Sequence, residues 1–210
     1  MSPIVNPDIE AYLRQLYETP DDIRHEMEAL AQREGFPIVG PLVGRHLLLL
    51  AQAIQARQVF ELGSGFGYSA LFFARAVGPE GRVQCTDLDP QNVSRGTEFL
   101  TRAGLAERVT YHQEEATAAL RRVGGTYDII YCDIDKDGYP ETIDLVHAHL
   151  RPGGLFITDN VLWGGRILDP HDESASTRGI LEFNRRLFAH PGFVASINPT
   201  RDGVAVALKV

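Results

Sequence analysis

The chain has 210 residues, of which 44% are hydrophobic and 23% are charged, as is ordinary for one soluble globular domain. Acidic residues outnumber basic ones by 28 to 20, so we expect neither a nucleic-acid partner nor a membrane partner. The first residues lack the pattern of a secretory signal, and no apolar run is long enough to span a bilayer. Two cysteines lie in apolar runs and are expected to be buried and reduced. We therefore expect a cytoplasmic protein.

Helices are predicted in the first part of the chain. Thr19 as a cap, followed by Pro20 and two acids, predicts a helix that ends just before Gly35. Pro41 begins a second predicted helix, which runs through Gln55. No internal repeat and no flexible linker follows, so we expect a single domain.

From residue 58 short apolar runs alternate with helical segments. The predicted strands are 58–62, 82–87, 108–113, 127–132 and 154–159, with predicted helices between them at 68–77, 90–103, 115–122 and 140–150. This alternation is typical of a parallel sheet covered by helices on both faces. A helix at 177–190 and a tight strand pair at 193–198 and 203–209 follow, and the pair should form an antiparallel hairpin. The predicted fold class is therefore α/β and doubly wound, with ligands beyond the carboxyl ends of the strands.

A glycine-rich loop, ELGSGFGYSA, follows the first predicted strand. Gly63, Gly65 and Gly67 let the backbone turn sharply and approach a ligand, although such a turn can also lack a function. Dinucleotide binding needs G-x-G-x-x-G, and a tyrosine stands where the last glycine is required. Asp87 ends the second strand and is either a helix cap or an acceptor for ribose hydroxyls. Together these features indicate an adenosine-containing cofactor, and Glu61 beside the loop favours a cationic group on it over a pyrophosphate.

The run DIDKDG, residues 133–138, places three aspartates around Lys136 at the end of the fourth predicted strand. It matches the start of a calcium-binding loop, but it is entered from a strand and the usual final Glu ligand is replaced by Asp. Neighbouring parallel strands lie about 4.8 Å apart, so Asp133 could converge with Asp159 and Asn160 from the next strand end. Two carboxylates and an amide oxygen suit a hard divalent cation, Mg²⁺ most naturally. The alternative is a strand-end turn capped by its own side chains.

Lysine is rare in this chain. Only Lys136 and Lys209 are lysines among 20 basic residues. Lysine can release its proton inside a protein and arginine cannot. A lysine among three aspartates therefore suggests a base, with an ion pair to Asp135 or Asp137 as the alternative.

These motifs resemble those of the cation-dependent class I S-adenosylmethionine-dependent O-methyltransferases, such as catechol and caffeoyl-coenzyme A O-methyltransferases and their small bacterial relatives. The likeness extends over nearly the whole chain, from FPIVGPLVG through ELGSGFGYS, CTDLDP, YDIIYCDIDKDGY and ITDNVLWGG to RDGVAVALKV. It implies one domain over 1–210, with a helical part at 1–56 and a Rossmann-like core at 57–210. It also implies a seven-stranded sheet with an antiparallel last strand, and a homodimer.

The resemblance assigns roles to particular residues. S-adenosylmethionine would be held by Val39, Glu61, Gly63, Ser64, Gly65, Ser69, Asp87, Glu115, Ala116 and Asp133. Asp133, Asp159 and Asn160 would bind the divalent cation, Mg²⁺ first, with Mn²⁺ or Ca²⁺ as alternatives. Lys136 and Asp133 would be catalytic, with Lys136 as the base, and a phenolic substrate would contact Lys136, Asn160 and Trp163. After the third strand the family commonly has a glycine and a small polar residue, where this chain has two glutamates.

The implied reaction moves a methyl group from S-adenosylmethionine to a hydroxyl of a catechol-like small molecule, with a caffeoyl-CoA-like thioester as the alternative acceptor. A hydroxyl near a divalent cation loses its proton more easily, and Lys136 would accept that proton. We expect segment 164–178 to be an irregular loop that helps to select the substrate. Two other classes remain: a nicotinamide-dependent oxidoreductase, disfavoured by the glycine spacing, and a non-catalytic binding protein, disfavoured by the complete set of ligands and base.

Overall fold

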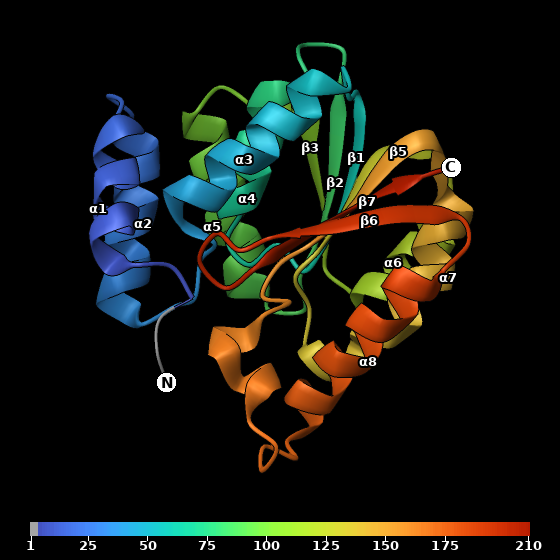
Figure 1. The fold of residues 1–210 in the computed structure, drawn as a ribbon. Coiled ribbons are helices and arrows are strands. Elements are labelled where there is room, and N and C mark those ends of the chain that lie inside the picture. Colours follow the sequence, from blue (N-terminus) through green and yellow to red (C-terminus); the bar gives the residue numbers. More distant parts are fainter. Residues whose placement is uncertain (1–3) are drawn as a thin grey trace.

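The computed structural model describes residues 4–210, whose strands form one mixed sheet (Figure 1). The strands are β1 (Gln58–Leu62), β2 (Arg82–Thr86), β3 (Val109–His112), β4 (Tyr127–Cys132), β5 (Leu150–Thr158), β6 (Phe193–Asn198) and β7 (Val204–Lys209). Their order is β3-β2-β1-β4-β5-β7-β6, and β7 runs antiparallel to both of its neighbours. The winding reverses between β1 and β4, which confirms the predicted doubly wound α/β fold and its antiparallel hairpin.

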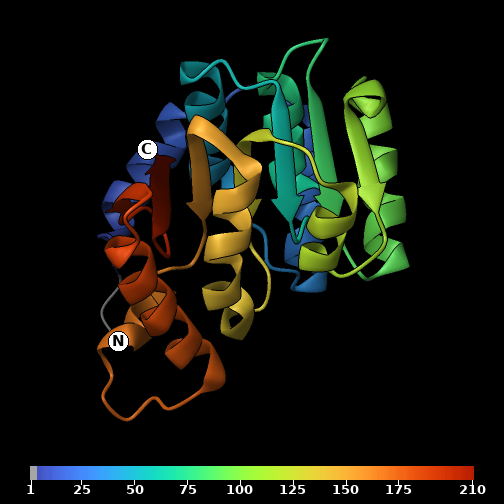
Figure 2. The ribbon, with the colours of Figure 1, turned by 90° about the vertical axis from the view of Figure 1, so that its right-hand side faces the viewer.

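Helices cover both faces of this sheet. They are α1 (Pro7–Leu16), α2 (Asp22–Glu34), α3 (Gly40–Ala53), α4 (Tyr68–Ala76), α5 (Pro90–Arg102), α6 (Ala116–Val123), α7 (Tyr139–His149) and α8 (Ala175–Ala189). α3, α4 and α5 lie on one face of the sheet, and α6, α7 and α8 lie on the other (Figure 2). The buried side chains of each group form the core on their own face. Within residues 4–210, every helix is too short or too polar to cross a membrane.

The central strands supply both cores alternately. Val59 and its register partner Ile129 face the core that contains α3 and α4, whereas Phe60 and Ile130 face the core that contains α7 and α8. Successive side chains of a strand point to opposite faces, so a strand buried on both faces is apolar at most positions, and the buried Glu61 of β1 is an exception. This requirement explains the unbroken apolar runs in the sequence. It also fixes the strand ends, from which the site residues project.

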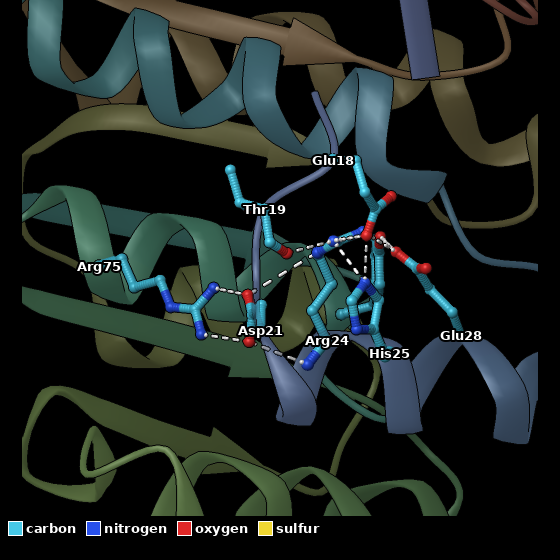
Figure 3. A network of polar contacts seen from close by, with 8 residues as sticks. Glu18, Thr19, Asp21, Arg24, His25, Glu28 and Arg75 are labelled. Carbon is cyan, nitrogen blue, oxygen red and sulfur yellow. Dashed lines mark hydrogen bonds and ion pairs between the residues drawn. The ribbon is translucent and has the colours of Figure 1, made fainter. Parts of the chain in front are cut away.

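The start of α2 differs from the sequence-based expectation. Asp21, rather than Thr19, caps the helix, and its side chain accepts a hydrogen bond from the backbone N–H of Arg24 at 3.1 Å. Arg75 of α4 also donates to Asp21 at 3.0 Å, and Arg24 donates to the Thr19 carbonyl oxygen at 3.1 Å (Figure 3). The cap hydrogen bond is local, and Arg75 adds a contact from a residue far along the chain. Local sequence signals do not contain that information.

Segment 164–178 is more ordered than expected. A 3-10 helix spans Trp163–Leu168, and α8 already begins at Ala175. Ser174 caps α8 by accepting from the backbone N–H of Thr177, and Arg166 donates to Asp172 at 2.6 Å. The irregular stretch is thus confined to the few residues between Leu168 and Ala175. These local hydrogen bonds hold it close to Trp163, over whose ring Arg166 lies.

Candidate active site

A cavity of about 1240 Å³ opens at the carboxyl ends of the parallel strands, where the winding reverses. Almost every residue singled out in the sequence lines it: Val39, Gly63, Ser64, Gly65, Ser69, Asp87, Glu115, Ala116, Asp133, Lys136, Asp159, Asn160 and Trp163. Glu61 alone lies outside the lining, because its carboxyl group is fully buried beneath the glycine loop. The fold therefore brings together residues that are spread over more than half of the chain.

The glycine loop is held tightly against two strand ends. Gly63 has φ +82°, and a side chain there would place its Cβ 2.7 Å from the carbonyl oxygen of Asp133. The buried Thr86 fixes the loop from β2: its hydroxyl accepts from the N–H of Gly63 and donates to the carbonyl oxygen of Glu61, both at 2.9 Å. The N–H of Ser64 donates to the carbonyl oxygen of Thr86 at 2.8 Å. Ser64 is thereby presented to the cavity on a rigid turn.

Glu61 is buried with only neutral partners. The Ser69 hydroxyl donates to its Oε1, and the Cys85 thiol donates to its Oε2 at 3.5 Å. Burial raises the pKa of Glu61 to about 7, against the opposing hydrogen bonds from Ser69 and Ser64. Such a carboxyl group gains a full negative charge more easily when a cationic ligand group lies nearby.

Asp87 is available to a ligand. Its Oδ1 accepts from the N–H of Asp89 at 2.8 Å and from the side-chain amide of Asn92 at 3.2 Å. The helix cap of α5 is Asp89, which accepts from the N–H of Gln91 at 2.8 Å. The alternative prediction that Asp87 is the cap is therefore wrong. Among residues 4–210 no group hydrogen-bonds Oδ2 of Asp87. That oxygen can accept from a ribose hydroxyl.

The two glutamates after β3 have structural partners. Glu115 caps α6 and accepts from the backbone N–H groups of Thr117 at 2.8 Å and Ala118 at 2.7 Å. Glu114 forms an ion pair with Arg122. The side chain of Glu115 is therefore committed to the helix, and its backbone remains the part that can border an adenine.

Asp133 and Asp159 follow the register partners Cys132 and Thr158 at the ends of β4 and β5. Asp159 is only 2% exposed, and its Oδ1 is buried without a hydrogen-bond partner among the described residues. Burial, followed by the negative charge of Asp133, raises the pKa of Asp159 to about 7. An unpaired buried carboxyl oxygen beside a second carboxylate is stabilised either by a bound proton or by a cation. These residues therefore fit a divalent metal ion.

The third expected ligand, Asn160, lies next to Asp159 with φ +58°, in the left-handed region. No group of three or more His, Cys, Asp or Glu side chains within residues 4–210 could hold a metal ion. The expected set has two carboxylates and one amide, so water or a substrate would complete the coordination shell. An open shell of this kind leaves room for an acceptor molecule.

Lys136 pairs with an expected metal ligand. Its Nζ lies 2.6 Å from Oδ1 of Asp133 and donates to the carbonyl oxygen of Ile134 at 3.1 Å. The ammonium also lies over the ring of Tyr139, 5.0 Å from its centroid. An ion pair, the alternative role considered for Lys136, is present, but its partner is Asp133 and neither Asp135 nor Asp137.

The sequence model of the O-methyltransferase family matches residues 22–210 of this chain. The chain belongs to this family. It is 31% identical to the catechol O-methyltransferase of Niastella koreensis, over 95% of this chain and 96% of the relative. It is 30% identical to caffeoyl-CoA O-methyltransferase 5 of Nicotiana tabacum, over 80% of this chain and 75% of the relative.

The fold of this O-methyltransferase agrees with a solved member of the family. The structure of the Bacillus cereus O-methyltransferase in complex with SAH superimposes with a TM-score of 0.88, at 25% identity and over 97% of both chains. The protein is therefore an S-adenosylmethionine-dependent O-methyltransferase, as the motifs had indicated. The oxidoreductase and the non-catalytic alternatives do not describe it.

The sequence reasoning missed two positioning residues of this O-methyltransferase. Thr86 fixes the glycine loop, as described above. Asp202, in the turn between β6 and β7, accepts from the side-chain amide of Asn160 at 3.4 Å and from the N–H of Gly164. Its carbonyl oxygen accepts from the N–H of Leu162 at 2.9 Å. The run RDG was visible in the sequence, but nothing local showed that it meets the strand end of β5.

Proposed function

We propose that this O-methyltransferase methylates one hydroxyl of a catechol-like small molecule, using a divalent cation and Lys136 as the base. The observation that carries the proposal is Asp159, a buried carboxyl group with an unpartnered oxygen beside Asp133. A cation held by Asp133, Asp159 and Asn160 would make a nearby acceptor hydroxyl more acidic and draw its oxygen into the site. Mg²⁺ is the first candidate, with Mn²⁺ and Ca²⁺ as alternatives.

Lys136 would receive the proton of that hydroxyl. Its side chain is 12% exposed, which limits access by bulk water, and the Asp133 carboxylate holds its Nζ at the strand end. A base must be within hydrogen-bond reach of the proton that it takes. A base must be able to exchange a proton, and an arginine at the same position would not do so.

The cofactor is expected to lie along the β1 and β2 ends. Ser64 and Ser69 face the methionine part from the glycine loop, and Asp87 offers Oδ2 to the ribose. The buried Glu61 beneath Ser69 favours the cationic amino group of methionine. The protein's main contribution is then to hold the methyl donor in line with the acceptor oxygen.

The charge of the cavity supports a small acceptor over a coenzyme A thioester. Three basic residues line it, against nine acidic ones: Glu28, Asp87, Glu114, Glu115, Asp133, Asp135, Asp137, Asp159 and Asp202. A ligand with several phosphates would meet like charges over much of this surface. Relatives of both kinds are known, so charge is the feature that favours the catechol.

Transfer of labelled methyl from S-adenosylmethionine tests the proposal. Catechol, 3,4-dihydroxybenzoate and caffeoyl-CoA would each be assayed with Mg²⁺ and with EDTA. We expect transfer to the two small acceptors with Mg²⁺, and loss of that transfer with EDTA. Transfer to caffeoyl-CoA alone would contradict the acceptor class, and equal rates with EDTA would contradict the role of the metal.

A further inference from the structure

Arg201, in the β6–β7 turn, is the cavity-lining cation whose charge the proposed chemistry does not use. Arg14 pairs with Glu10 at 2.6 Å, and Lys136 pairs with Asp133 at 2.6 Å. Arg201 has no carboxylate partner anywhere in the described part of the chain. Its charge acts on Asp159 without an ion pair, so its N–H donors remain available to a ligand.

The guanidinium of Arg201 lies between the expected cofactor and acceptor regions. Its Nη1 donates to the carbonyl oxygen of Ile38 at 2.7 Å, one residue before Val39. A Cβ on Gly40 would stand 3.1 Å from the same nitrogen, so the absence of a side chain there leaves room for the guanidinium. The next residue, Asp202, contacts Asn160 on the acceptor side.

Arg201 is also held in an unusual backbone conformation. Its φ is +51°, in the left-handed region that favours glycine or asparagine. The turn is fixed on both sides, since the N–H of Gly203 donates to the Thr200 carbonyl oxygen at 3.0 Å and the Leu162 N–H donates to the Asp202 carbonyl oxygen at 2.9 Å. Backbone strain of this kind is concentrated at functional sites.

We propose that Arg201 binds a carboxylate inside the cavity. A guanidinium has five N–H donors in a planar fork that matches a carboxylate, and Ile38 engages one nitrogen. The acidic lining disfavours a more highly charged anion in the same place. The carboxylate belongs either to the methionine part of the cofactor or to an acidic acceptor, such as a dihydroxybenzoate. Only the acceptor case rests on the proposed function.

Arg201→Gly is the decisive variant, because it removes the guanidinium and suits the left-handed backbone. Arg14→Gln is the matched control, since Arg14 also lines the cavity but is neutralised by Glu10. Calorimetry would measure binding of SAH and of 5′-methylthioadenosine, which lacks the carboxylate. Methyl-transfer assays would compare kcat/KM for 3,4-dihydroxybenzoate and for catechol.

If the cofactor supplies the carboxylate, Arg201→Gly weakens SAH binding by about 10- to 100-fold and leaves 5′-methylthioadenosine unchanged. If the acceptor supplies it, kcat/KM falls by a similar factor for 3,4-dihydroxybenzoate and not for catechol. Arg14→Gln changes neither quantity. The inference would be overturned if Arg201→Gly changed none of these affinities and kcat/KM values. It would also be overturned if all four ligands lost affinity or kcat/KM equally, because that result would show a purely structural role.

The proposed function fails separately from this inference. A wild-type protein that binds SAH but methylates neither acceptor would contradict the proposed function. The comparison of SAH with 5′-methylthioadenosine would then still decide the role of Arg201 through the cofactor alone.

Discussion

Glu61 and Asp159 are both buried near the cavity without a cationic side chain paired to either within residues 4–210. Burial is the first cause that raises the pKa of each to about 7. A buried carboxylate is costly unless a cation lies beside it. We interpret Glu61 as prepared for the amino group of the cofactor and Asp159 as prepared for a metal ion.

Glu61→Gln tests the first interpretation through pH. The pKa of Glu61 is 4.5 in the unfolded chain and about 7 in the folded protein, so the folded state retains a proton that the unfolded state loses between these values. Stability therefore falls as the pH rises through this window, and Gln removes that loss. Without cofactor, we expect the free energy of unfolding of Glu61→Gln to exceed that of the wild type by up to about 3 kcal/mol near pH 8. Near pH 4 the two values should be equal.

Urea denaturation at the two pH values measures this difference, and calorimetry measures SAH binding. We expect SAH to bind Glu61→Gln about 10-fold more weakly, because the amino group loses its ionised partner. A stability difference that is the same at both pH values would show that Glu61 does not titrate in this window.

Lys136→Arg separates a base from an ion-pair partner. Arginine keeps the positive charge beside Asp133 but cannot give up its proton. We expect kcat to fall by about 100-fold or more, with KM for the acceptor and the affinity for SAH little changed. Lys136→Ala, which removes both the base and the positive charge, is compared with Lys136→Arg in the same kcat and KM measurements. Full activity in Lys136→Arg would assign Lys136 a structural role.

At the scale of elements, the site depends on where strands end. β4 and β5 are adjacent and in register, so the sequence order of apolar run and aspartate was enough to predict that Asp133 and Asp159 meet. The contact of Arg75 with the α2 cap residue Asp21 and the contact of Asp202 with Asn160 could not be predicted in this way. Both join residues more than 40 positions apart, which no local pattern specifies.

Asp202→Ala tests the contact between the β6–β7 turn and the β5 end. Asp202 accepts from the Asn160 amide and from the Gly164 N–H, beside Trp163. We expect divalent metal affinity to fall about 10-fold, because Asn160 loses the partner that orients its oxygen. Trp163 is the single tryptophan of the chain, so the protein's fluorescence should shift as the packing around Trp163 loosens.

Asp144→Ala, on α7, is the control for this experiment, since its side chain is 72% exposed, pairs with Arg186 and does not line the cavity. It should change neither metal affinity nor fluorescence. Unchanged metal affinity in Asp202→Ala would show that Asn160 is oriented by other contacts or is not a ligand.

At the scale of the whole molecule, exposed apolar side chains lie at one edge of the sheet. β6 is the edge strand, and its Val194 is 62% exposed beside the register partner Leu208, which is 39% exposed. Exposed apolar side chains on an edge strand favour association with another chain. We propose that the expected homodimer covers this edge.

Light scattering after size exclusion tests the assembly. We expect a dimer for the wild type, a monomer for Val194→Asp, and a dimer for Leu168→Asp, which alters an exposed leucine elsewhere. The charge introduced at Val194 would be buried without a partner in the dimer. A monomeric wild type, or a dimeric Val194→Asp variant, would contradict the proposal that a homodimer covers the β6 edge.

The central claim is that the carboxylates at the β4 and β5 ends hold a divalent cation that methyl transfer requires. The most direct measurement is the rate of methyl transfer to 3,4-dihydroxybenzoate as Mg²⁺ is titrated, in the wild type and in Asp159→Asn. We predict saturable activation of the wild type and a rate lower by about 100-fold or more in Asp159→Asn, with SAH affinity preserved. A wild-type rate that is independent of Mg²⁺ and unaffected by EDTA would contradict the account.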